Sequence, residues 1–429
     1  MEIRWILKRF VFLKRILLEF VDYLFYQKSS QFLLHSWNAH KTPYKSIIYY
    51  NFFGRIFLGL REFLALLTND KLFKKGIKLE CFEKDSKEYK RGSYEILWPK
   101  SPMLKISNYE LDDNFCKKIE LSLKLSQKKE FQNFDKTLEW ERIAALMVER
   151  FLDKDGKIIK KNLINFRADA KLYQELFNDE FYYLDCEKGF KRLYLDAIDL
   201  VLEQHRLASK VDKSILASLS ESRAGNNLCA IYRGKRLSQK SMFYALIVDD
   251  IVKNIPFIPQ YRSVIVDVGC GYGGLARILS FYTPNSCHVL LDLPETLILT
   301  SYFIKYNFPE AKIALLDDLS NLQNFDKYIK EYDFIIIPPS VLKSLKDESV
   351  DLVINSASMG FMQKEYQEFY LEEIGRILKS GGYFYSLNKD YDDKWGRGFY
   401  SWDYKKEYIT RVFEYNNRFS YPQWLGQKI

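Results

Sequence analysis

The chain has 429 residues, 47% of them hydrophobic and 28% charged, and its formal net charge is +9. At roughly 150 residues per domain this length suggests two or three domains, and the composition is that of a folded protein. Its six cysteines form no Cys-x-x-Cys pair, and the Cys and His spacings do not suit zinc. A disulfide framework and a metal site are therefore not expected, and we expect a cytoplasmic protein.

Residues 1–70 are predicted to form a basic, apolar helical extension. Residues 1–60 contain nine Lys and Arg against three Asp and Glu, and in the helix predicted over 4–25 the charges fall on one stripe. Apolar runs are too short for a membrane span or a signal peptide. We expect these helices to pack on the rest of the protein, with peripheral contact at the inner face of the membrane as the alternative.

Residues 71–135 are polar and poorly periodic, and are interpreted as a connecting region with a few strands. Residues 136–250 are predicted to form a helical cap over the substrate site. The helical periodicity in this region covers 138–152, 190–211 and 238–255.

From residue 251 to the end, strands alternate with helices, which predicts a parallel, doubly wound, Rossmann-like α/β sheet. The expected strands are 264–268, 288–292, 333–339, 351–355 and 381–388, and the expected helices are 274–282, 295–306 and 365–379. Residues 311–316 form a further strand whose place in the sheet the sequence leaves open.

The stretch VIVDVGCGYGGLARIL (264–279) combines a strand, a glycine turn and a helix, as in nucleotide-binding sites. It fits two patterns. Glycines 269, 271 and 274 satisfy the dinucleotide motif GxGxxG, whereas Asp267 with glycines 269, 271 and 273 satisfies DxGxGxG, typical of S-adenosylmethionine enzymes. Asp292, 23 residues after Gly269, suits the ribose hydroxyls of either cofactor.

Three features favour S-adenosylmethionine over NAD. Asp267 would repel a pyrophosphate but suits a cofactor that carries an ammonium and a sulfonium. The sheet leaves no room for a separate C-terminal catalytic domain, and IGRILKSGGYFYSLN (374–388) places a basic helix end and a Gly-Gly turn before the last expected strand. The glycines let the backbone lie against the cofactor.

Four segments together resemble class I S-adenosylmethionine-dependent methyltransferases: VDVGCGYGGLARIL, LLDLPETL, SVDLVINSASM and LKSGGYFYSLNK. Within that class the chain is most similar to the sugar O-methyltransferases of bacterial surface-polysaccharide loci, with NLINFRAD (162–169) and SRAGNN (222–227) as the upstream counterparts. The resemblance covers about residues 136–400. The chain departs from this group at SMGFM, which lacks an expected Glu, and at GNN, where Gly-Asn-Pro is usual.

The resemblance implies transfer of a methyl group to a sugar hydroxyl in cell-surface polysaccharide biosynthesis, with a sugar, nucleotide-sugar or glycan acceptor. It also implies roles for eight residues. The cofactor's methionine and ribose part would lie against Asp267, Gly269, Gly271 and Gly273, its ribose against Asp292, its adenine against Leu293, and its methyl group near Asn355 and Ser356.

A hydroxyl acceptor needs a base, and we consider three candidates. Asp390 ranks first because it follows the last expected strand at the ligand-binding edge of the sheet. Glu221 ranks second because it adjoins the SRAGNN segment. His205 ranks third because its apolar helical register favours the core.

Two other functions stay open from the sequence. One is an NAD-dependent oxidoreductase that uses the same glycine loop. The other is a methyltransferase fold without catalysis that acts as an interaction subunit. A nucleic-acid partner is not expected, because the basic excess lies in the apolar N-terminal helices.

Overall fold

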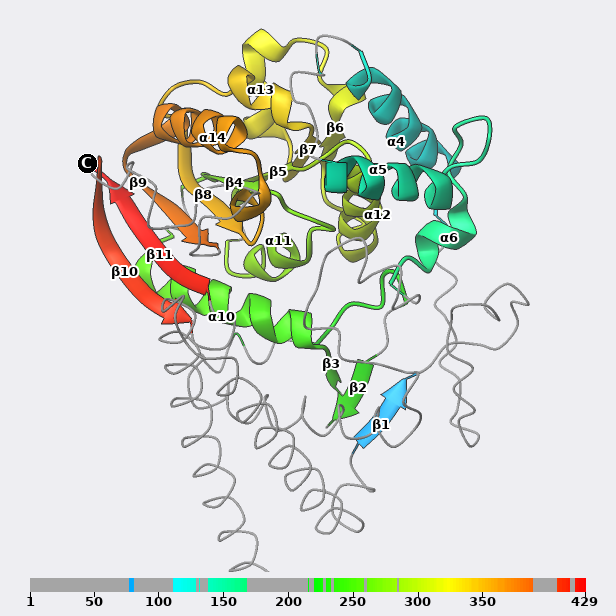
Figure 1. The fold of residues 1–429 in the computed structure, drawn as a ribbon, viewed down its shortest axis with the longest axis horizontal. Helices are drawn as coiled ribbons and strands as arrows, with labels where there is room; N and C mark the ends of the chain where they lie inside the picture. Colours follow the sequence, from blue (N-terminus) through cyan, green and yellow to red (C-terminus); the bar gives the residue numbers. More distant parts are fainter. Residues whose placement is uncertain are drawn as a thin grey trace, which may run out of the picture.

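A computed structural model describes residues 77–80, 111–128, 131, 138–167, 215, 220–226, 229–232, 235–257, 261–283, 285–388, 407–416 and 421–429. Its main feature is an eight-stranded sheet in the order β10-β11-β9-β8-β4-β5-β7-β6 (Figure 1). The strands are β4 (Ser263–Val268), β5 (Ser286–Leu291), β6 (Ile313–Leu315), β7 (Phe334–Ile337), β8 (Val350–Ser356), β9 (Leu378–Leu387), β10 (Tyr408–Asn416) and β11 (Tyr421–Lys428). A smaller antiparallel sheet contains β1 (Ile77–Glu80), β2 (Cys229–Tyr232) and β3 (Lys235–Leu237).

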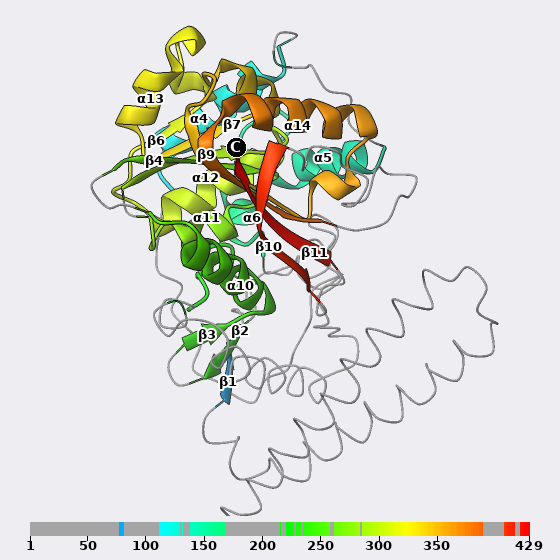
Figure 2. The ribbon, with the colours of Figure 1, turned by 90° about the vertical axis from the view of Figure 1, so that its left-hand side faces the viewer.

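Helices cover both faces of the large sheet. They are α4 (Asp113–Ser126), α5 (Leu138–Phe151), α6 (Lys160–Ile164), α10 (Gln239–Asn254), α11 (Gly274–Leu279), α12 (Thr296–Asn307), α13 (Phe325–Glu331) and α14 (Lys364–Ile377). Short 3-10 turns are η5 (Leu316–Asp318), η6 (Leu322–Asn324), η7 (Pro339–Ser344) and η8 (Met359–Phe361). Figure 2 shows α13 and α14 on one side of the sheet and α10 and α11 on the other.

The central strands are Val, Ile and Leu runs because both of their faces are buried. β4 pairs in parallel with β5 and β8, and every residue of β4 is buried. Ile265 packs in the cluster formed with α10, α11 and α12, whereas Val264 and Val266 pack in the cluster formed with α13 and α14. Two cores on opposite faces define a doubly wound sheet. The expected fold class is confirmed.

Residues 311–316, whose place in the sheet the sequence left open, contain the edge strand β6. β6 pairs with β7 alone, and β7 lies between β6 and β5. Sequence order therefore does not give the spatial order here. The three residues of β6 are too few for their apolar pattern to show where the strand lies in the sheet.

Helix α4 supports this edge although its sequence was interpreted as part of a connecting region. Its N-terminus is capped by Asp112, which accepts a hydrogen bond from the Asn114 backbone. Three contacts join it to η5: Lys118 Nζ lies 2.6 Å from Asp318 Oδ1, and Ser122 Oγ donates to Asp317 Oδ1 at 2.8 Å and accepts a hydrogen bond from the Asp317 backbone at 3.1 Å. The helix was missed because its charged residues conceal a narrow apolar stripe.

Beyond the last expected strand, 381–388, the structure adds two strands that the sequence analysis did not predict, and they are antiparallel. β11 pairs antiparallel with β9, and β10 pairs antiparallel with β11. Trp424 of β11 is 1% exposed and packs edge-on against Phe384 and Tyr408. The hairpin therefore extends the core at this edge.

Several expectations fall on other parts of the chain. The helices predicted within 1–70 and over 190–211 lie outside the described residues, so the domain division and the membrane contact stay predictions. In the described part of the chain, no helix is long and apolar enough to cross a membrane.

Candidate active site

A pocket lies at the carboxyl ends of β4, β5 and β8, beside the glycine loop of residues 269–273. Six of the eight residues expected to bind the cofactor line it: Asp267, Gly269, Gly271, Asp292, Leu293 and Ser356. They come together because parallel strands deliver their carboxyl ends to one edge of the sheet.

Asp292 ties the glycine loop to the end of β5. Its Oδ2 accepts a hydrogen bond of 2.8 Å from the backbone N–H of Gly271, and its Oδ1 accepts one of 2.7 Å from that of Leu293. Gly271 has φ +56°, a left-handed conformation that glycine adopts without steric cost. The Gly271 carbonyl accepts a 2.6 Å bond from Thr300 Oγ1 on α12. The loop is thus fixed from both sides.

Of the two carboxylates of the pocket, Asp267 is buried and Asp292 is half-buried. Burial, and then the charge of Asp292, raise the pKa of Asp267 to about 7. Burial also raises the pKa of Asp292 to about 6, against the hydrogen bonds from Gly271 and Leu293. No salt bridge to Asp267 occurs among the described residues. A site of this kind favours a positively charged ligand.

Ser356 adds an uncompensated polar group to the same pocket. It ends β8, and its Oγ is buried without a hydrogen-bond partner in the described part of the chain. A buried hydroxyl without a partner costs free energy unless a ligand or water satisfies it.

Gly273 and Asn355 are placed differently from expectation, behind the pocket wall. A Cβ on Gly273 would lie 3.1 Å from Ile304 Cδ1, so this glycine allows α11 to approach α12. Asn355 is fully buried. Its Nδ2 donates to the Val268 carbonyl at 2.8 Å, and its Oδ1 accepts 2.8 Å from Asn388 Nδ2. Both residues shape the site from behind.

Glu221 does not fit the role of general base. It is absent from the pocket lining and forms a buried ion pair in which Glu221 Oε2 lies 3.2 Å from Arg167 Nη2. Glu221 also accepts hydrogen bonds from the Ser222 backbone at 2.8 Å and from Ser238 Oγ. Burial would raise the pKa of Glu221, but the charges of Arg167 and Arg277 hold it below its usual value.

The other two base candidates, Asp390 and His205, lie outside the described residues. No group of three or more His, Cys, Asp or Glu side chains suited to a metal ion occurs among the residues that the structure describes. The expectation of a metal-free site stays a prediction.

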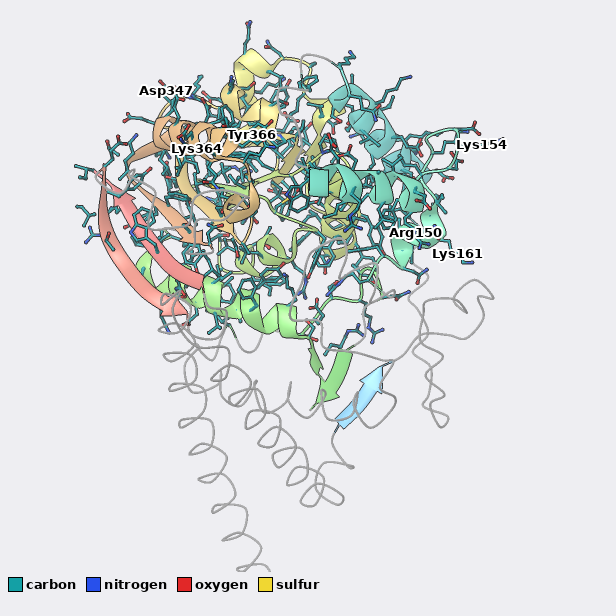
Figure 3. All side chains as sticks on the ribbon, in the orientation of Figure 1. Arg150, Lys154, Lys161, Asp347, Lys364 and Tyr366 are labelled. Atoms are coloured by element: carbon teal, nitrogen blue, oxygen red, sulfur yellow. The ribbon has the colours of Figure 1, made fainter. Side chains whose placement is uncertain are left out.

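The sequence did not predict the aromatic side of the pocket. It consists of Trp140 from α5, Phe243 and Tyr244 from α10, and Tyr366 and Tyr370 from α14, with Lys240 beside them (Figure 3 labels Tyr366). Residues 240 and 244 are four apart in α10, and residues 366 and 370 are four apart in α14, so each pair lies on one face of its helix. This spacing is the signal in the sequence that could have found them. Which face meets the pocket depends on the packing of the helices.

Comparisons with known proteins agree with this geometry. Residues 266–386 match the family described as methyltransferase domain. The Probable S-adenosylmethionine-dependent methyltransferase CRG1 of Saccharomyces cerevisiae is 24% identical over 191 residues. That match covers 43% of this chain and 56% of the yeast protein, so the chain spans just over half the length of this relative.

Solved structures that match part of this chain include the PH0226 protein from Pyrococcus horikoshii OT3, at 15% identity and a TM-score of 0.33, covering 45% of this chain and 92% of that one. A geranyl diphosphate C-methyltransferase from Streptomyces coelicolor has 11% identity and a TM-score of 0.30, covering 51% of this chain and 85% of that one.

The doubly wound sheet and its glycine loop define a Rossmann-like class I methyltransferase fold. Residues 266–386 match a methyltransferase domain, and the cofactor is S-adenosylmethionine. The NAD-dependent oxidoreductase considered from the sequence has no support here.

Proposed function

We propose that this protein transfers the methyl group of S-adenosylmethionine to a sugar hydroxyl in the biosynthesis of a cell-surface polysaccharide. The observation that carries the proposal is the pair of carboxylates, the buried Asp267 and the half-buried Asp292, which line one pocket with the glycine loop. When bound, the cofactor supplies a methyl group on a cationic sulfur, a leaving group that needs no acid.

The cofactor side of the pocket is assigned by chemistry. Asp292 is held by two backbone N–H groups, and its carboxylate oxygens retain lone pairs for the ribose hydroxyls. Asp267 would face the ammonium of the methionine part, and Leu293 would pack on the adenine. Ser356 would hydrogen-bond near the reacting methyl group. These assignments keep the cofactor aligned, which is worth about 7–11 kcal/mol of the barrier.

The aromatic side of the pocket supports a sugar acceptor. Tyr and Trp present a flat apolar face with a polar edge, which suits the face of a sugar ring. The two upstream segments that resemble sugar O-methyltransferases also pack together: the Arg167 backbone N–H donates to the Gly225 carbonyl at 2.8 Å, and Asn226 Nδ2 donates to Asn165 Oδ1 at 2.6 Å.

Asp390 remains the proposed base. The chain leaves β9 at Asn388, whose side chain donates to Asn355 and accepts 3.1 Å from the Gly360 backbone. Asn388 therefore sits at the carboxyl end of the sheet, where the pocket lies. Asp390 follows two residues later, and a base there would take the proton of the acceptor hydroxyl.

Calorimetric titration and a methyl-transfer assay test the proposal. We expect S-adenosylmethionine to bind and NAD not to bind, and we expect transfer of labelled methyl groups to sugar or nucleotide-sugar acceptors. Asp390→Asn should lower turnover with little change in cofactor affinity. Binding of S-adenosylmethionine without transfer to any glycan acceptor would favour the non-catalytic interaction subunit.

A further inference from the structure

The cofactor carries three formal charges at neutral pH: a sulfonium, an ammonium and a carboxylate. The two pocket carboxylates, Asp267 and Asp292, suit the ammonium and the ribose hydroxyls. The cofactor carboxylate needs a positive partner, because burying a charge without one is costly. Lys240 is the basic residue in the described pocket lining.

Lys240 lies beside the end of the glycine loop. It is the second residue of α10, and α10 packs against α11, the helix that follows the loop (Figure 1). One turn further along α10, Tyr244 approaches Gly274 so closely that a Cβ there would lie 2.5 Å from Tyr244 Cε2. The Lys240 ammonium lies 5.6 Å from the Tyr244 ring centre and 5.5 Å from that of Phe243. Two aromatic faces thus hold the charge at the pocket wall.

The position of Lys240 in its helix also points to an anion. The first turn of α10 contains no acidic residue, and its N-terminal backbone is already capped through Ser238 and Ser241. A cation in the first turn opposes the helix dipole. An anionic ligand at this place would be attracted by the helix terminus and by the lysine together.

We propose that Lys240 binds the carboxylate of S-adenosylmethionine, so that α10 completes a cofactor site whose other residues lie in the methyltransferase domain. This inference rests on the proposed function. It places a cofactor-binding residue upstream of residues 266–386, the part that matches the family. Lys240 and Asp267 then bind the two ends of the amino-acid group.

The test compares ligands with and without that group. The probes are S-adenosylhomocysteine, which has the carboxylate, and 5′-methylthioadenosine, which lacks the whole amino-acid part. By calorimetry, Lys240→Met should weaken S-adenosylhomocysteine at least tenfold and change 5′-methylthioadenosine less than twofold. Lys240→Arg, which keeps the charge, should stay within a few-fold of the parent for both.

Lys253→Met is the matched control, because Lys253 lies at the far end of the same helix and pairs with Asp249 at 2.5 Å. It should leave both affinities unchanged, and circular dichroism should show all variants folded. Equal weakening of both ligands by Lys240→Met would overturn the inference and assign Lys240 to pocket shape. Unchanged affinities, or a raised acceptor KM alone, would overturn it while the proposed function stands. Failure of the parent protein to bind S-adenosylmethionine would overturn both.

Discussion

Glu221 and Asp267 are both buried carboxylates, and they lie in opposite electrostatic surroundings. Glu221 has a guanidinium, a hydroxyl and a backbone N–H as partners, and its pKa is lowered despite burial. Asp267 lines a pocket, has no ion-pair partner in the described part of the chain, and its pKa is raised to about 7. A carboxylate whose charge is already satisfied is structural, whereas one that is buried and uncompensated is suited to bind a cation.

The Arg167–Glu221 pair nevertheless supports the site from behind. The Arg167 guanidinium is 4.8 Å from the ring centre of Tyr272, which belongs to the glycine loop. Gly225 makes the approach possible, because a Cβ there would lie 2.6 Å from the Phe166 ring and 2.9 Å from Arg167 Cδ. The two upstream segments therefore form one packed unit against the cofactor loop.

Breaking the ion pair gives the largest expected effect. Arg167→Met leaves the buried Glu221 charge unpaired and should lower the free energy of unfolding by about 3–5 kcal/mol, measured by urea denaturation. The double variant with Glu221→Gln should lose less than the two single variants together. A Glu221→Gln protein with parental stability, intact cofactor binding and lost turnover would instead make Glu221 the base.

Neutralising Asp267 should have the opposite effect on stability. Its folded-state pKa of about 7 lies above the ordinary 3.8, so its contribution to stability is lost as pH rises through about 7. Asp267→Asn should therefore stabilise the cofactor-free protein at pH 8, by at most about 4 kcal/mol, while it weakens S-adenosylmethionine. Thermal melts without cofactor check the gain in stability, and melts with cofactor check the loss of binding. A destabilised variant would mean that Asp267, like Glu221, is already partnered.

Asp292→Ala should weaken S-adenosylmethionine by about 1.5–3 kcal/mol, through loss of a charged hydrogen-bond partner of the ribose. Calorimetry measures this loss, and the Asp317→Ala variant is a control because Asp317 pairs with Ser122 away from the pocket. Parental affinity in Asp292→Ala would remove the ribose assignment.

The sequence predicted the features that depend on local pattern. The glycine loop, the parallel strands and six residues of the pocket lining follow from apolar runs, glycine spacing and the common edge of a parallel sheet. Lys240 and the aromatic side were missed because the orientation of α5 and α10 is set by packing. Glu221 was misjudged because its partner Arg167 lies 54 residues away. Only the fold places a guanidinium beside it.

Per pH unit, the smallest expected effect is the pH dependence of cofactor binding. Between pH 7 and 5.5 the ammonium of S-adenosylmethionine stays largely protonated, so the titrating groups are Asp267, with a pKa of about 7, and Asp292, with a pKa of about 6. The bound ammonium favours the ionised form of Asp267, and hydrogen bonds donated by the ribose hydroxyls favour the ionised form of Asp292, so each carboxyl group releases its proton on binding. Affinity should therefore fall as pH drops below about 7, by about tenfold per pH unit for each coupled proton. Titrations in buffers of different ionisation enthalpy measure the protons released.

Asp267→Asn should flatten the upper part of the profile of affinity against pH, whereas Glu221→Gln should leave its shape unchanged, because the lowered pKa of Glu221 keeps it ionised throughout. A profile that shifts with Glu221→Gln and not with Asp267→Asn would reverse the roles of the two carboxylates.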